Sequence, residues 1–115
     1  MWLNRLLVVP IVLALSSAAE AQQPTRTPRV AYLTGTPLSA MTDRTEAFRQ
    51  GLRELGHVEG KNIVIEWRSP EGKPDRMPTL AAELVRLKVD VIVTAGGEAT
   101  RSAKEATSTI PIVMA

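Results

Sequence analysis

The fold of this chain is decided by residues 80–97, LAAELVRLKVDVIVTAGG, and by residues 106–114, ATSTIPIVM. The pattern predicts a helix, a buried strand, a glycine turn, a second helix and a second buried strand. Strands that alternate with helices in this way are typical of an α/β protein, a parallel sheet with helices on both faces. Ligands of such sheets bind outside the carboxyl ends of the strands.

The earlier part of the chain predicts another strand and helix. The apolar run at residues 29–33 has the length of a strand, and the loop after it leads to a helix. Asp43 is the expected N-cap of this helix, with Glu46 three positions later, and Gly56 is the expected stop. Four residues form its expected apolar face: Ala47, Phe48, Leu52 and Leu55.

Residues 62–68 alternate between apolar and polar side chains, which suits a strand at the edge of a sheet. Asp75 is the expected cap of the next helix. Two further strands are expected, at residues 89–94 and at residues 110–114, and Asp90 interrupts the apolar run of the first of them. The apolar face of that helix has helical spacing: Met77, Leu80, Ala81, Leu84 and either Leu87 or Val85. The element order is β-α-β-α-β-α-β, and we expect the spatial strand order 2-1-3-4.

Composition limits the classes of function. The 115 residues form at most one domain, and 14 basic against 12 acidic residues give no electrostatic argument for a nucleic-acid partner. The chain has no cysteine, which excludes disulfides, thiolate metal sites, a cysteine nucleophile and a lipoprotein anchor. One histidine is too few for a histidine metal cluster, so we expect neither a metal nor a cofactor.

The N-terminus has the three parts of a secretory signal peptide. Residues 1–5 carry one positive charge, residues 6–15 are apolar, and Ala19-Glu20-Ala21 provides small residues at a cleavage site. We therefore expect a signal peptide at residues 1–21, a disordered lead-in at residues 22–28 and a periplasmic protein. An uncleaved membrane anchor is the alternative, although the apolar run is short for a bilayer span.

Two loops are expected to meet at the point where the strand order reverses, between the first and third strands. Their residues are the expected ligand-binding set: Thr34, Gly35, Thr36, Ala95, Gly96, Gly97, Glu98 and Thr100. The glycines allow close approach of a backbone, the following helix offers N–H groups, and the threonines offer hydroxyl groups. The alternative is that these are ordinary turn residues, and neither of the two common phosphate-loop motifs is present.

No catalytic constellation is visible. His57 is expected in a turn at the opposite edge of the sheet from the crevice, as a surface histidine. Glu66 and Glu71 have the positions of ordinary strand and loop charges rather than of an acid–base pair. Trp67 suits packing at the sheet edge, and Asp90 suits a strand start or a partner for a helix.

Four blocks of the sequence resemble one known family. Residues 46–56, 58–68, 80–93 and 106–114 are similar, in this order, to the ABC transporter substrate-binding proteins of the tryptophan/tyrosine type. The resemblance extends from about Arg29 to Ala115, and the expected signal peptide agrees with it.

The resemblance implies a type I periplasmic-binding-protein fold, in which two α/β lobes close over a small ligand and present it to an ABC permease in the inner membrane. Residues 29–115 then correspond to an incomplete first lobe, because family members are much longer. The family's contacts from this lobe come from the loops after strands one and three, where Thr34, Gly35, Thr36, Ala95, Gly96 and Ala99 match. Gly97 and Glu98 depart from the family pattern, and Glu98 would repel an anionic ligand group.

The expected function is therefore that of the solute-binding component of an importer, with no enzymatic activity, and the family favours an amino acid as the ligand. One lobe alone cannot enclose a ligand, so we expect weak binding or none by this chain. The alternatives are an enzyme on a flavodoxin-like or Rossmann-like domain, the effector-binding domain of a repressor, and a truncated product that does not fold.

Overall fold

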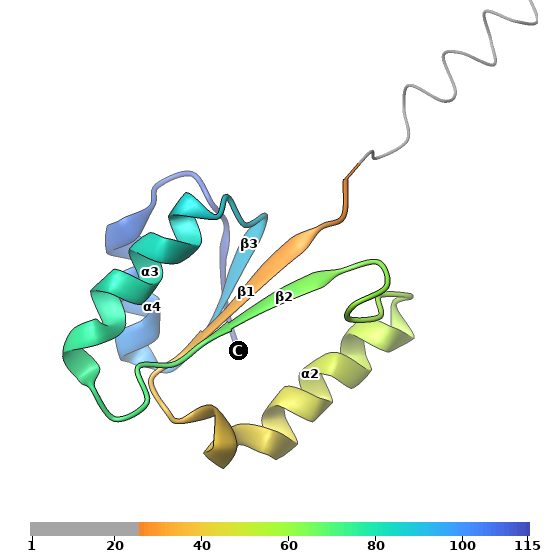
Figure 1. The fold of residues 1–115 in the computed structure, drawn as a ribbon, viewed down its shortest axis with the longest axis horizontal. Coiled ribbons are helices and arrows are strands. Elements are labelled where there is room, and N and C mark those ends of the chain that lie inside the picture. The colour runs from red at the N-terminus through yellow and green to blue at the C-terminus, as the bar shows by residue number, and fades with distance from the viewer. Residues whose placement is uncertain (1–25) are drawn as a thin grey trace, which may run out of the picture.

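The computed structural model describes residues 26–115, which form a parallel sheet of four strands in the order β2-β1-β3-β4 (Figure 1). This is the strand order that the sequence predicts. The expected signal peptide at residues 1–21, and residues 22–25 of the lead-in, lie outside the described residues. The strands are β1 (Arg29–Thr34), β2 (Val64–Arg68), β3 (Val91–Ala95) and β4 (Ile112–Met114).

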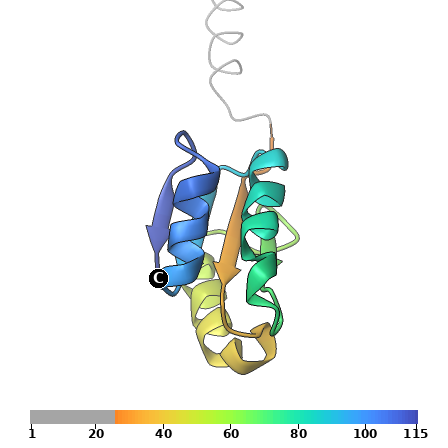
Figure 2. The same cartoon turned by 90° about the vertical axis from the view of Figure 1, so that its left-hand side faces the viewer.

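Helices cover both faces of the sheet, as the alternating pattern predicts. Figures 1 and 2 show α3 (Met77–Arg86) and α4 (Gly97–Ala106) side by side on one face and α2 (Thr42–Glu54) on the other. Two short 3-10 turns, η1 (Leu38–Met41) and η2 (Pro74–Arg76), lead into α2 and α3. No helix in the described residues is both long enough and apolar enough to span a membrane.

Each face of the sheet has its own apolar core, because alternate residues of a strand point to opposite faces. Under α3 and α4 the core contains Ala31 and Leu33 of β1 and Ile92 of β3, none of which is exposed to solvent. Four residues of the expected face of α3 are buried there: Met77, Leu80, Ala81 and Leu84. The fifth expected position differs, because Leu87 lies beyond the end of the helix and is 36% exposed, and Val85 is only half-buried. Ala99 and Ala103 bring α4 close to the sheet.

Under α2 the core is built around three aromatic rings. Tyr32 of β1 lies 5.2 Å from Phe48 and 5.1 Å from Trp67, measured between ring centroids. Val30, Ile65 and other aliphatic side chains complete this core. Trp67 therefore packs at the edge of the sheet, as expected.

The expected face of α2 is only partly right. Phe48 and Leu52 contact the core, but Ala47 is exposed and Leu55 has 77% of its surface exposed. Met41, just before the helix, and Thr45 take the other buried positions, so the contact stripe starts earlier than predicted.

Leu55 points outward because α2 ends at Glu54. Gly56 has a φ of +90°, its N–H donates to the Arg53 carbonyl, and the His57 N–H donates to the Leu52 carbonyl. These two bonds form the helix-ending motif that favours glycine. The predicted stop at Gly56 is confirmed.

The two predicted helix caps are wrong. No side chain of residues 26–115 caps α2 or α3, Asp43 lies inside the first turn of α2, and Asp75 lies in η2. In each case a 3-10 turn leads directly into the helix, and at α3 the Met77 N–H donates to the Pro74 carbonyl. Backbone carbonyls of such a turn can take N–H groups that a side-chain cap would otherwise satisfy.

Asp90 stands immediately before β3, so the expected role at a strand start is confirmed. Its carboxylate accepts the Arg29 N–H at 2.8 Å and pairs with the Arg26 guanidinium, and its own N–H donates to the Arg29 carbonyl. The bond from the Arg29 N–H, with those from Arg26, holds the pKa of Asp90 below its ordinary value. The side chain of Asp90 thus extends the contact between β1 and β3.

The two edges of the sheet differ in charge. On β2, Glu66 pairs with Arg29 at 3.5 Å and with Arg68 at 3.3 Å, and Arg68 also reaches Glu83 of α3. On β4 the edge is apolar, and Val113 and Met114 are 52% and 74% exposed. The half-polar strand therefore lies at an edge, as predicted.

Candidate functional site

The carboxyl ends of β1 and β3 lie side by side. Thr34 at the end of β1 is the register partner of Ala95 at the end of β3, so the loops after these strands leave the sheet at the same level. Figure 2 shows this end of β1 beside the turn that leads to α2 and near the start of α4. The two loops that the sequence predicts as a ligand site are thus neighbours.

Thr34 and Ala95 lie in the wall of this site rather than on its surface. Thr34 is 1% exposed and Ala95 is 7% exposed. The Thr34 hydroxyl donates to the sulfur of Met41 at 2.9 Å and accepts the Thr36 N–H at 3.2 Å. It therefore shapes the first loop.

Gly35 and Glu98 line the same hollow, which has a volume of about 190 Å³. The hollow thus joins the loop after β1 to the first turn of α4. A Cβ added at Gly35 would lie 3.7 Å from Cε of Met77, an ordinary contact that would narrow the hollow. The loop after β2 and the start of α3 complete the lining: Pro70, Gly72, Lys73, Pro74 and Met77.

Gly96, Gly97 and Thr100 line a separate hollow of about 430 Å³ that extends along α4 to Met114 of β4. Gly96 is the N-cap of α4, has a φ of +98°, and leaves the helix start without a side-chain cap. The N–H groups of the first turn are therefore available to a ligand. The Thr100 hydroxyl is engaged within the protein, 2.8 Å from the Thr94 hydroxyl and 3.0 Å from the Gly96 carbonyl.

Thr36 lines a third hollow, of about 580 Å³, at the start of α2. Its remaining lining comes from one segment, residues 39–44. The expected residues therefore lie along one edge of the sheet but are divided among three hollows, with Thr34 and Ala95 behind them.

The loop after β2 also belongs to this edge, although the sequence pattern does not predict it as part of the site. The Ser69 hydroxyl donates to the Thr36 carbonyl at 3.0 Å, and the Leu38 N–H donates to a carboxylate oxygen of Glu71 at 3.4 Å. Glu71 has a φ of +50°, which a non-glycine residue rarely adopts. The predicted strand order could have identified this loop as part of the site, because β2 is parallel to β1 and its carboxyl end lies at the same edge of the sheet.

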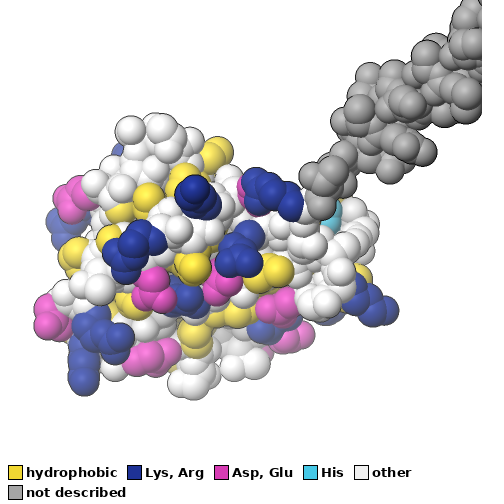
Figure 3. Space-filling view, turned by 45° about the horizontal axis from the view of Figure 1, so that its top comes forward, with side chains coloured by type: hydrophobic (Ala, Val, Ile, Leu, Met, Phe, Trp, Pro, Cys, Tyr) yellow, Lys and Arg dark blue, Asp and Glu magenta, His cyan; other side chains and the backbone are white. Residues whose placement is uncertain are grey.

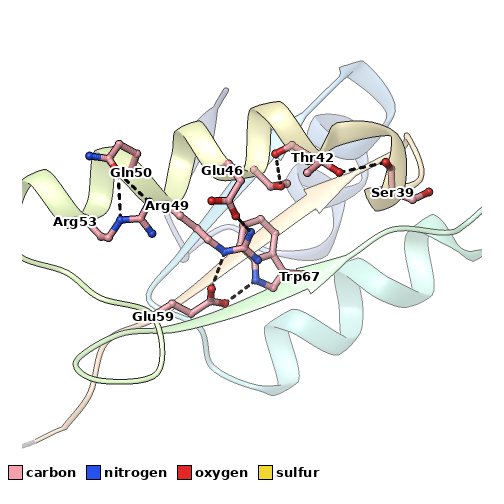
Figure 4. Close-up of polar contacts among 9 residues, drawn as sticks. Ser39, Thr42, Glu46, Arg49, Gln50, Arg53, Glu59 and Trp67 are labelled. Carbon is pink, nitrogen blue, oxygen red and sulfur yellow. Dashed lines mark hydrogen bonds and ion pairs between the residues drawn. The ribbon is translucent and has the colours of Figure 1, made fainter.

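A second polar cluster lies away from this edge, between α2 and β2 (Figure 4). The Arg49 guanidinium lies 4.4 Å from the ring centroid of Trp67 and pairs with Glu59 at 2.7 Å. The Glu59 carboxylate also accepts the indole N–H of Trp67 at 2.8 Å. The members satisfy one another, which indicates a structural role.

The pKa values in this cluster agree with a closed network. The hydrogen bond to Glu59 raises the pKa of Arg49 further above its ordinary value. Burial acts to raise the pKa of Glu59, but the hydrogen bonds from Trp67 and Arg49 hold it below its ordinary value. Both side chains are therefore charged at neutral pH.

Charge is mixed on the face of the molecule in Figure 3, where basic and acidic side chains are interspersed. Among the described residues, no group of His, Cys, Asp and Glu side chains has the arrangement of a metal site.

A family model described as "ABC transporter substrate binding protein" matches residues 35–115 of the chain. The match includes the loop after β1 and all later elements. A comparison with curated proteins finds no match.

Three solved structures share the fold. One is a conserved domain protein from Vibrio cholerae, with 28% identity and a TM-score of 0.71 over 77% of this chain and 30% of that one. Another is the ligand-free, open form of a substrate-binding protein with adhesive properties from Clostridium difficile, with 20% identity and a TM-score of 0.70 over 76% of this chain and 30% of that one.

The third is an ABC domain from Streptococcus pneumoniae in complex with L-Trp, with 21% identity and a TM-score of 0.70 over 78% of this chain and 30% of that one. The chain thus spans about 30% of the length of the structures that it matches.

Proposed function

Because the chain belongs to the family of ABC transporter substrate-binding proteins, we propose that it holds a small solute at the carboxyl edge of its sheet for delivery to an ABC permease. The observation that carries this proposal is the meeting of three loops at that edge. The Thr36 carbonyl accepts a hydrogen bond from Ser69 in the loop after β2, and Gly35 shares a hollow with Glu98 of α4.

The ligand class that we propose is an amino acid. The Streptococcus pneumoniae structure of the same fold contains L-Trp, which is a fact about that protein. In this chain, backbone groups and small side chains dominate the edge, and Gly96 and Gly97 leave open space beside the start of α4. Such an edge suits a small polar molecule whose charged groups meet N–H donors.

We propose further that residues 29–115 belong to the N-terminal lobe of a two-lobe protein of the periplasmic binding protein type I fold. The chain covers about 30% of each matched structure, in agreement with part of one lobe. The ligand would then lie between two lobes that close by a hinge. Isolated, this lobe supplies half of the contacts, so its affinity is low.

The signal-peptide pattern of residues 1–21 supports export to the periplasm. There the partners would be the small solute and the permease in the inner membrane. Export and the family both favour binding over catalysis and over the effector-binding role of a repressor.

The test is an NMR titration of the isotope-labelled chain with a panel of neutral sugars, nucleosides and amino acids at millimolar concentration. We expect backbone amide shifts confined to Gly35, Thr36 and residues 96–100. The Gly35→Leu variant should abolish them, since its side chain would enter the hollow beside Met77.

The Gly51→Ala variant is the matched control, because a Cβ at Gly51 has nothing within 4 Å. Absence of shifts with every solute, or equal shifts in the Gly35→Leu variant, would refute binding at this edge. Micromolar affinity of the chain alone would contradict the two-lobe part of the proposal.

A further inference from the structure

The hollow between Gly35 and Glu98 carries one basic and one acidic side chain. Lys73 comes from the loop after β2, Glu98 comes from the first turn of α4, and both line the same 190 Å³. The rest of the lining is apolar or glycine, and Met77 forms a buried part of it. Two opposite charges thus belong to one small apolar depression.

Lys73 carries a charge that no other described residue pairs with. Within the described residues no ion pair or side-chain hydrogen bond involves Lys73, and the residue is exposed. The two nearest acids along the chain do not compete strongly, because Glu71 accepts the Leu38 N–H and Asp75 does not line the hollow. The backbone at Lys73 is fixed, since its N–H donates to Pro70 and its carbonyl accepts from Arg76.

Glu98 has a fixed position in the first turn of α4, but the cation that pairs with its carboxylate can be exchanged. Its carboxylate lies in the first turn of α4, where the helix dipole favours a negative charge. It pairs with Arg101 at 2.6 Å, but both side chains are more than 60% exposed, at 69% and 64%. Ion pairs this exposed contribute little, so a ligand ammonium group can replace Arg101.

We propose that Lys73 and Glu98 determine the specificity of the site by binding the two charged ends of one zwitterion. Lys73 pairs with a carboxylate and Glu98 with an ammonium group, while the apolar lining excludes water. A ligand with only one charge meets an unfavourable partner on the other side of the hollow. The inference rests on the proposed function and assigns its ligand recognition to two named side chains.

The experiment compares three probes that differ only in charge: L-tryptophan, tryptamine without the carboxylate, and indole-3-propionate without the ammonium group. NMR titrations give the dissociation constants for the chain and for the Lys73→Gln and Glu98→Gln variants. We expect L-tryptophan to bind best, and each variant to bind it about two- to fivefold more weakly, as the loss of one solvent-exposed ion pair predicts. Lys73→Gln should leave the affinity for tryptamine unchanged or raise it, and Glu98→Gln should do the same for indole-3-propionate, because each change removes a like charge.

The control variants are Lys61→Gln and Glu54→Gln, two exposed residues that do not line the hollow. They should bind all three probes as the unaltered chain does. Equal losses in test and control variants overturn the inference, and so does equal affinity for the three probes. If sugars or nucleosides of the panel bind at this edge and none of the three probes does, the specificity inference fails while the proposed function stands.

Discussion

Replacing Gly96 by alanine tests how the start of α4 is positioned at the site. Gly96 has φ +98° and ψ 157°, a backbone region that is almost restricted to glycine. Space is not the constraint, because a Cβ at this position has nothing within 4 Å. The cost of the Gly96→Ala change is therefore backbone strain alone, about 1–3 kcal/mol of the free energy of unfolding.

Gly97 provides a control one residue away. It has equally open space and is the first residue of α4, with no left-handed φ, so Gly97→Ala should leave the stability unchanged or raise it by up to about 1 kcal/mol. Urea denaturation of the purified chain, followed by far-ultraviolet circular dichroism, measures both variants. Equal stabilities of the Gly96→Ala and Gly97→Ala variants would refute the argument from backbone conformation.

Three further predictions concern stability. Leu84 is fully buried, so Leu84→Ala should lower the free energy of unfolding, measured by urea denaturation, by about 2–5 kcal/mol. Leu55 is 77% exposed, so Leu55→Ala should lower it by less than about 0.5 kcal/mol. Similar losses of stability in the two variants would contradict the assigned core. Lys88 lies just beyond the end of α3 at Arg86 and has a φ of +55°, so Lys88→Gly should stabilise the chain by about 0.5–1 kcal/mol. Lys104→Gly inside α4 should destabilise it by about 1 kcal/mol, and a loss of stability from Lys88→Gly would refute the strain. The pKa of Asp90 is lower in the folded chain than in the unfolded one, so its contribution is present above about pH 4 and is lost as pH falls through the folded value. Asp90→Asn should therefore weaken the decline of stability below about pH 4, and an unchanged pH profile would exclude this role.

The sequence predicts the layers of the fold because periodicity reports burial, and burial decides layers here. At and just before β2, Ile63, Ile65 and Trp67 alternate with Val64, Glu66 and Arg68, and this half-polar pattern predicts a strand at an edge, from which the order 2-1-3-4 follows. Helix starts were harder to predict. Asp43 has the right residue type for a cap, but η1 is a backbone arrangement with no clear apolar period, so the true start at Thr42 is not visible in the pattern.

For the site, sequence predicts which loops meet but not where side chains point. Thr34 has the residue type of a ligand-contacting hydroxyl, and only the structure shows it bonded to Met41. Lys73 lies in a loop with ordinary turn composition, and its position depends on contacts far along the chain, such as that between Ser69 and Thr36.

The two edges of the sheet differ in how readily they would accept an added strand. Along β2, Glu66 and Arg68 would place charges against any incoming strand, whereas β4 presents Val113 and Met114. An added strand, whether from a fused peptide or a designed extension, should therefore join at β4. Tags or reporters attached near β2 would leave the β4 edge of the sheet accessible to an added strand.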